Sequence, residues 1–98
     1  MKEFNNMKIT EEQEEQIINF GVFGYSNERM SCLLGIDENG IEEEMEDTSS
    51  EFCKLYVKGK IKADYVIDCK LFDMARSGDI KALDKLNSRK TARKRSQK

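Results

Sequence analysis

The stretch "SSEFCKLYVKGKIKADYVIDCKLFDMARSG", residues 49–78, decides the fold class, because it is one long helical pattern without proline. Thr48 followed by Glu51 forms a capping box that predicts the start of this helix, and Gly78 predicts its end. Gly59 interrupts the pattern and indicates either a kink or a close approach of another helix. We therefore expect an all-α protein built around this helix.

The long helix is apolar on two sides. One stripe contains Phe52, Leu55, Tyr56, Gly59, Ala63, Val66 and Ile67. The second stripe contains Val57, Ile61, Tyr65, Cys69 and Phe72. A helix that is apolar on two sides needs two partners. We expect the N-terminal part of the chain on one side and a neighbouring subunit on the other; the alternative is a single wide core face in a compact monomer.

Three shorter helices are expected before the long one. A capping box that begins at Thr10 opens the first helix, and Gly24 is placed to end it. Ser26 caps the second helix, and Gly35 turns the chain into a third helix capped by Asp37. The spacing of the apolar residues around this turn predicts a helix-turn-helix, with a generic three-helix cluster as the alternative.

The third helix lies in "DENGIEEEMED", residues 37–47, which carries seven acidic side chains and no basic one. A DNA-reading helix usually presents Arg, Lys, Asn or Gln to the base edges, and this segment offers only Asn39. Each carboxylate close to a phosphate costs on the order of 1 kcal/mol. We therefore do not expect this helix to dock in the major groove on its own. At Glu44 an apolar core residue is usual, and Met45 beside it is the expected substitute.

The chain ends with a short helix and a basic segment. Asp79 caps the helix "DIKALDKL", after which six of the ten residues from Arg89 to Lys98 are basic. Such a tail is expected to be flexible. By neutralising up to about six phosphates, it would give a slope of about −5 when the logarithm of the DNA-binding constant is plotted against the logarithm of the salt concentration. Contacts of this kind do not read the base sequence. The expected DNA-contacting residues are Arg89, Lys90, Arg93, Lys94, Arg95 and Lys98 in the tail and Lys54, Lys58, Lys60 and Lys62 in the long helix.

Four segments follow from these patterns. They are an N-terminal extension at residues 1–9, a helix-turn-helix domain at 10–47, a helical oligomerisation region at 48–88 and a basic flexible tail at 89–98. Their charges differ strongly, since residues 1–51 have a net charge of −11 and residues 52–98 a net charge of +9. This asymmetry predicts an acidic partner such as nucleic acid, or contact between the acidic half of one copy and the basic half of another; two solvated faces are the alternative.

Several classes of protein are disfavoured. The first ten residues have no apolar segment typical of a signal peptide, and no apolar run reaches the roughly 18 residues of a membrane span. The three cysteines are widely spaced and the sequence has no histidine, so we expect no metal site and no cofactor. Without histidine, a phosphate-binding loop or a nucleophile elbow, the sequence indicates a protein that is not an enzyme, in a reducing cytoplasm.

The second half of the chain follows the pattern "F…Y..GK.KA…….L…A..GD..A…L". Its residues are Phe52, Tyr56, Gly59, Lys60, Ala63, Leu71, Ala75, Gly78, Asp79, Ala82 and Leu86. With a helix-turn-helix before it, this pattern resembles the small terminase subunit of tailed bacteriophages over residues 11–87. The resemblance implies a non-enzymatic packaging factor in the host cytoplasm. It would assemble into a ring, engage double-stranded viral DNA, and recruit and regulate the large terminase ATPase–nuclease.

By this resemblance the long helix is the oligomerisation element. The expected oligomerisation residues are Phe52, Tyr56, Val57, Ile61, Tyr65, Phe72, Glu42, Glu43 and Glu44. The acidic third helix would pair with the lysines between Lys54 and Lys62 of a neighbouring subunit, and the basic tails would hold DNA. Two other functions fit the sequence: a dimeric helix-turn-helix transcriptional regulator, and an acidic helical adapter without nucleic-acid function.

Overall fold

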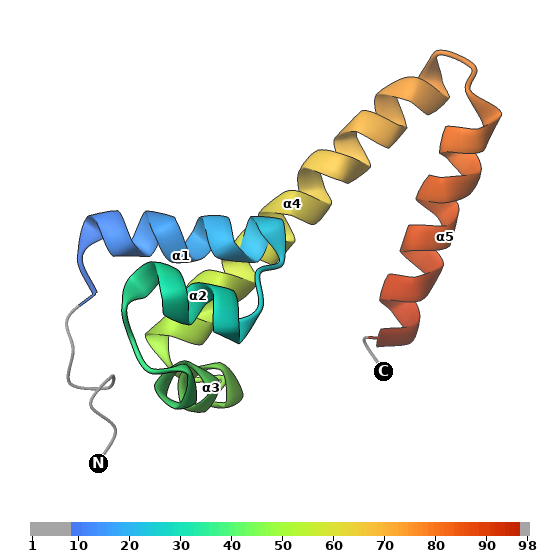
Figure 1. Ribbon diagram of the computed structural model, residues 1–98. Coiled ribbons are helices and arrows are strands. Elements are labelled where there is room, and N and C mark those ends of the chain that lie inside the picture. Colours follow the sequence, from blue (N-terminus) through green and yellow to red (C-terminus); the bar gives the residue numbers. More distant parts are fainter. Residues whose placement is uncertain (1–8, 97–98) are drawn as a thin grey trace. The chain divides into compact units, whose positions relative to one another are not determined.

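The computed structural model describes residues 9–96 (Figure 1). The extension expected at residues 1–9 lies outside this range except for Ile9, and so does Lys98. The described residues contain no strand, and their helices are α1 (Glu11–Phe23), α2 (Asn27–Leu34), α3 (Glu38–Glu46), α4 (Glu51–Arg76) and α5 (Ile80–Ser96). The all-α prediction is therefore confirmed.

The chain forms two compact units, one up to Ala63 and one from Asp64 onward, and α4 contributes to both. The N-terminal unit contains α1, α2, α3 and the first half of α4. The C-terminal unit contains the second half of α4 and α5.

The helix ends of the N-terminal unit follow local sequence signals. At the start of α1, the Thr10 Oγ1 accepts a hydrogen bond from the Gln13 amide at 3.1 Å, and the Gln13 Oε1 accepts one from the Thr10 amide at 3.1 Å. The Ser26 Oγ accepts a hydrogen bond from the Arg29 amide at the start of α2. Gly24 and Gly35 end α1 and α2 with φ of 70° and 69°, a conformation that glycine adopts without strain. These predictions are confirmed.

Two predicted caps need correction. Asp37 is the N-cap residue of α3, but its side chain makes no capping hydrogen bond. The cap of α4 is Ser50 and not Thr48, because the Ser50 Oγ accepts a hydrogen bond from the Cys53 amide at 3.0 Å. The same hydroxyl donates to the Glu44 carbonyl at 2.8 Å, so Ser50 joins the end of α3 to the start of α4.

The core of the N-terminal unit is built from one or two side chains of each helix. Its buried residues are Ile17 and Phe20 of α1, Met30 of α2, Ile41 of α3, and Phe52 and Leu55 of α4. Between α2 and α3, the Ser31 Oγ donates a hydrogen bond to the Ile36 carbonyl, which fixes the turn after Gly35. At the edge of the core, the Tyr56 hydroxyl donates to the Tyr25 carbonyl at 2.9 Å, and burial raises the pKa of the Tyr56 phenol.

Glu44 occupies a core position of α3. Its side chain is only 3% exposed, whereas Met45 is half-buried and packs against the core from the side. Our expectation that Met45 would stand in for Glu44 in the core was therefore wrong. Our assignment of Glu44 to a subunit interface was also wrong, because a side chain enclosed within its own unit cannot reach a neighbour.

Helices α1 and α4 cross with their backbones in contact. A Cβ atom on Gly59 would overlap the Ile18 carbonyl group, and a Cβ atom on Gly21 would overlap the Tyr56 carbonyl group. Since no side chain larger than hydrogen fits at either position, the two glycines permit this crossing. The expectation of a close approach at Gly59 is confirmed, within a helix that is continuous from Glu51 to Arg76.

The C-terminal unit is a helical hairpin. After α4 the chain turns at Gly78, whose φ is 105°, and the Asp79 Oδ1 accepts a hydrogen bond from the Ala82 amide at 3.0 Å at the start of α5. Ala82 is buried and Leu86 is half-buried. The predicted cap at Asp79 is confirmed.

The basic tail is part of this hairpin. We expected a flexible segment from Arg89 onward, but α5 continues as a helix through Ser96. The expectation of a flexible tail is therefore wrong for residues 89–96.

Candidate nucleic-acid interface

Helix α5 carries the largest concentration of positive charge among the described residues. Between Ile80 and Ser96 it contains seven basic side chains and one acidic side chain. The structure divides these cations into two that are engaged with α4 and five that are exposed. Only the exposed ones are available to a ligand without a change in the fold.

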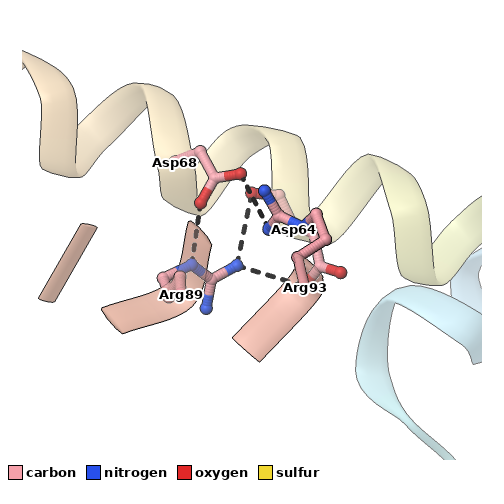
Figure 2. Close-up of polar contacts among 4 residues, drawn as sticks. All are labelled: Asp64, Asp68, Arg89 and Arg93. Carbon is pink, nitrogen blue, oxygen red and sulfur yellow. Dashed lines mark hydrogen bonds and ion pairs between the residues drawn. The ribbon is translucent and has the colours of Figure 1, made fainter. Parts of the chain in front are cut away.

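The two engaged cations are Arg89 and Arg93, which pair with Asp64 and Asp68 of α4 (Figure 2). The Arg89 guanidinium donates through Nε to Asp68 Oδ1 at 2.7 Å and through Nη2 to Asp64 Oδ1 at 3.2 Å. The Arg93 Nη2 lies 3.0 Å from the second oxygen of Asp68. Each helix contributes residues four positions apart, so the four side chains meet on the facing sides of the hairpin.

Electrostatics within this cluster favour the charged forms of its members. The hydrogen bond from Arg89, together with the charge of Arg93, holds the pKa of the Asp68 carboxyl below its usual value despite partial burial. The same hydrogen bond to Asp68 raises the pKa of Arg89. The side chains of Asp68 and Arg89 are 24% and 28% exposed, so solvent screens their pairing only in part.

The cluster changes the role of two expected DNA contacts. Arg89 and Arg93 serve the α4–α5 hairpin, since their guanidinium groups already have carboxylate partners. The sequence contained a signal for this arrangement that we had not used: an aspartate pair four residues apart on one helix and an arginine pair four residues apart on the next. Because the partners are 21 and 25 residues apart, local patterns did not connect them.

Of the DNA contacts expected on α5, Lys90, Lys94 and Arg95 remain available. All three are exposed, and within residues 9–96 none of them forms an ion pair. Lys90 and Lys94 are four positions apart and therefore lie on one side of the helix. These three residues are the strongest candidates for contacts with a phosphate backbone.

Polar side chains that the sequence analysis did not identify lie beside one of these cations, Arg95. A shallow groove along α5 is lined by Asp84, Asn87, Ser88, Thr91, Ala92 and Arg95. Amide and hydroxyl groups of this kind commonly donate hydrogen bonds to phosphate oxygens. In the sequence, these residues can be recognised as one group only by their helical spacing, which places them on the same face of α5, and not by their residue types.

The expected lysines of α4 belong to the N-terminal unit. Lys54, Lys58, Lys60 and Lys62 are all exposed. Three of them, Lys54, Lys58 and Lys62, are spaced by four residues and line one groove together with the side chains of Val57 and Ile61. Lys60 does not line this groove.

The second apolar stripe of α4 lies largely on the surface. Val57, Ile61, Tyr65 and Phe72 are 42%, 62%, 69% and 52% exposed. The alternative of a single wide core face in a compact monomer is therefore wrong.

The assignments to the first stripe also need correction. Val66 and Ile67 are exposed as well, so burial of the first stripe is confined to the part of α4 that packs on the N-terminal core. Phe52 is fully buried inside the chain, and Tyr56 is half-buried with its hydroxyl bonded to Tyr25. Phe52 is therefore not accessible to a neighbouring subunit, and Tyr56 offers only the exposed part of its side chain.

The surface of α3 is acidic, as the sequence predicts. Glu38, Glu42, Glu43 and Glu46 are exposed, and Asn39 is the one exposed side chain of this helix that typically reads bases. An array of carboxylates repels phosphate, so the geometry gives α3 no means of docking against DNA by itself.

Other classes of site find no support in the described residues. Within residues 9–96, no three His, Cys, Asp or Glu side chains are grouped so that they could hold a metal ion. None of the helices described is long and apolar enough to cross a bilayer. In comparisons with known proteins, no family model, no curated protein and no solved structure matches this chain.

Proposed function

We propose that this protein is a non-catalytic DNA-packaging factor of the small terminase type. It engages double-stranded phage DNA, self-associates, and recruits or regulates the large ATPase–nuclease subunit. The observation that carries the DNA-binding part is the exposed set Lys90, Lys94 and Arg95 on a helix with a net charge of +6. Such a helix attracts the phosphate backbone and releases its counterions.

The resemblance to small terminase subunits supports the packaging part of the proposal. The residues that carry it have structural roles in this chain: Phe52 fills the core, Gly59 permits the α1–α4 crossing, and Asp79 caps α5. The residues of the pattern therefore determine how the helices pack. Residues with such a role are the ones that proteins with a common fold would share.

The proposed mode of DNA binding is sequence-independent. Lysine and arginine contacts with phosphates position a protein on a duplex but do not identify bases. The acidic surface of α3 is unsuited to reading bases, because it repels the phosphates on either side of the groove. This disfavours a transcriptional regulator. Affinity for one copy is weak under this mode, and several copies on one duplex strengthen it by avidity.

Binding to a duplex of random sequence, measured by fluorescence anisotropy at several salt concentrations, tests the proposal. We expect the slope of log K against log salt to fall in magnitude by about 2.7 in the variant K90Q/K94Q/R95Q, because each of the three phosphate contacts contributes about 0.9. The control K70Q/K81Q/K85Q removes the same charge from other exposed positions of the C-terminal unit and should keep most of the slope. If the intact protein shows no salt-dependent binding, the DNA-binding proposal is wrong.

A specific observation favours a second candidate. The four exposed glutamates of α3 present a surface that suits the basic groove of another protein, as in an acidic adapter. An adapter predicts no retention of DNA even with α5 intact. Recruitment of the packaging ATPase is a separate property, which a change in the ATPase rate of a phage large subunit would report.

A further inference from the structure

The N-terminal unit has an apolar groove on the outer side of α4. It is lined by Thr48, Cys53, Val57 and Ile61 together with Lys54, Lys58 and Lys62. Val57 and Ile61 are 42% and 62% exposed, so their apolar surface is in contact with water in a single copy. An apolar surface edged by like charges is typical of a site for an amphipathic partner of opposite charge.

The three lysines form a regular row, which we call the lysine row. They are four residues apart, so their Cα atoms repeat at about 6 Å along the axis of α4. The same chain carries a matching acidic row on α3, consisting of Glu38, Glu42 and Glu46, which are also four residues apart and exposed. The two rows therefore have equal length, equal spacing and opposite charge.

Within residues 9–96, neither row has charged partners. No ion pair joins any of these six side chains to another residue in the described part of the chain. Next to the acidic row, Met45 is three positions after Glu42 and lies on the flank of that row. It is half-buried and supplies an apolar surface beside the carboxylates.

We infer that the groove on α4 is occupied by α3 of a second copy of this chain, with the acidic row of that copy on the lysine row. The contact covers Val57 and Ile61, and the methylene stems of the lysines pack along the incoming helix. This inference deepens the self-association part of the proposed function and rests on it. It also replaces our earlier choice of Glu42, Glu43 and Glu44, because Glu44 is buried and Glu43 is not in register with the lysines.

The contact joins two different surfaces, so each copy offers one donor and one acceptor. A heterologous contact of this type repeats from copy to copy and leads to a closed ring or to an open chain. It differs in this respect from a two-fold dimer, in which the same patch meets itself. The pairing of the two rows can therefore be tested by mixing two variants, one with the charges of the acidic row reversed and one with the charges of the lysine row reversed.

The experiment is light scattering of the full chain over a range of concentrations at low salt. We expect a mass that rises with concentration above the 11.4 kDa of one copy. The variants E38K/E42K/E46K and K54E/K58E/K62E should each weaken association roughly 10- to 100-fold, because three attractive pairs become repulsive. Mixed in equal amounts, they should associate again, since each row then meets a row of opposite charge.

Matched controls separate the contact from net charge. The variants E12K/E15K/E28K and K60E/K70E/K81E make the same changes of charge at exposed positions outside both rows, and should associate like the unchanged protein. The variant V57S/I61S tests the groove without altering charge and should also weaken association.

Three outcomes would overturn the inference. They are a mass of one copy at every concentration, row variants that associate no differently from their controls, and a mixture that stays dissociated although both of its components are helical by circular dichroism. DNA retention through α5 is measured on the same samples. If the unchanged protein assembles but does not bind DNA, the proposed function is wrong and the contact between copies is still supported.

Discussion

The crossing of α1 and α4 gives the most direct test of the fold, through replacement of Gly59 by alanine. In a helix interior without close neighbours, this change stabilises a protein by about 0.5–1 kcal/mol. At Gly59 the added methyl group overlaps the Ile18 carbonyl group, which is main chain and cannot rotate away. Overpacking a core costs about 1–3 kcal/mol, with the upper end expected against a backbone. The net expectation is a loss of about 2 kcal/mol.

The reciprocal position allows a stricter test of the same geometry. Alanine at Gly21 meets the Tyr56 carbonyl group and should also destabilise. Once one methyl group has separated the helices, the second methyl group overlaps the opposite backbone less. The double variant should therefore lose less unfolding free energy than the two single variants together, by at least about 0.5 kcal/mol. Gly35→Ala is the control, because it has φ of 69° and no atom within 4 Å. Its cost is conformational and should add to that of Gly59→Ala.

Urea unfolding followed by far-ultraviolet circular dichroism measures these free energies. The reasoning is refuted if Gly59→Ala is as stable as the unchanged protein or more stable, since the helices would then have room for a side chain. It is also refuted if the costs at Gly21 and Gly59 add fully, because the two sites would then not belong to one crossing.

Two further predictions concern α4. Ser50→Ala should lower the free energy of unfolding by about 1 kcal/mol through loss of the α4 cap, whereas Thr48→Ala should change it little; urea unfolding distinguishes the two. Because the folded state lowers the pKa of Asp68, its contribution to stability is complete above the unfolded pKa of about 3.9 and is lost as pH falls through the folded value. Asp68→Asn should therefore remove part of the acid dependence of unfolding, which urea unfolding at a series of pH values measures.

Features that depend on neighbouring residues could be predicted from the sequence. The capping box at Thr10 and the turns at Gly24 and Gly35 each need only a few consecutive residues, and all three were located correctly. The start of α4 was misplaced because hydroxyl residues follow one another from Thr48 to Ser50, and each of them is able to cap a helix. Only the position of the Cys53 amide selects Ser50.

Features that depend on distant residues could not be predicted in this way. The charge density after Arg89 suggested a flexible segment, but Asp64 and Asp68 neutralise part of it and α5 remains helical. Among the candidate DNA contacts, Lys90, Lys94 and Arg95 are exposed, while Arg89 and Arg93 are engaged with carboxylates of α4. The helix-turn-helix spacing marked position 44 as a core position, but the charge of Glu44 led us to expect Met45 there, and the structure buries Glu44 itself.

The backbone crossing at Gly21 and Gly59 also has an evolutionary consequence. Substitutions at these positions, or at Phe52 in the core, alter the arrangement of helices whatever the protein binds. The exposed faces of α3 and α5 carry no such packing constraint, so a change of charge there alters what the protein binds and not how its helices are arranged. Chains descended from a common ancestor would then keep the interior pattern while their ligands diverge. Related chains should therefore share residues in the interior, and differences in what they bind should appear on the surface.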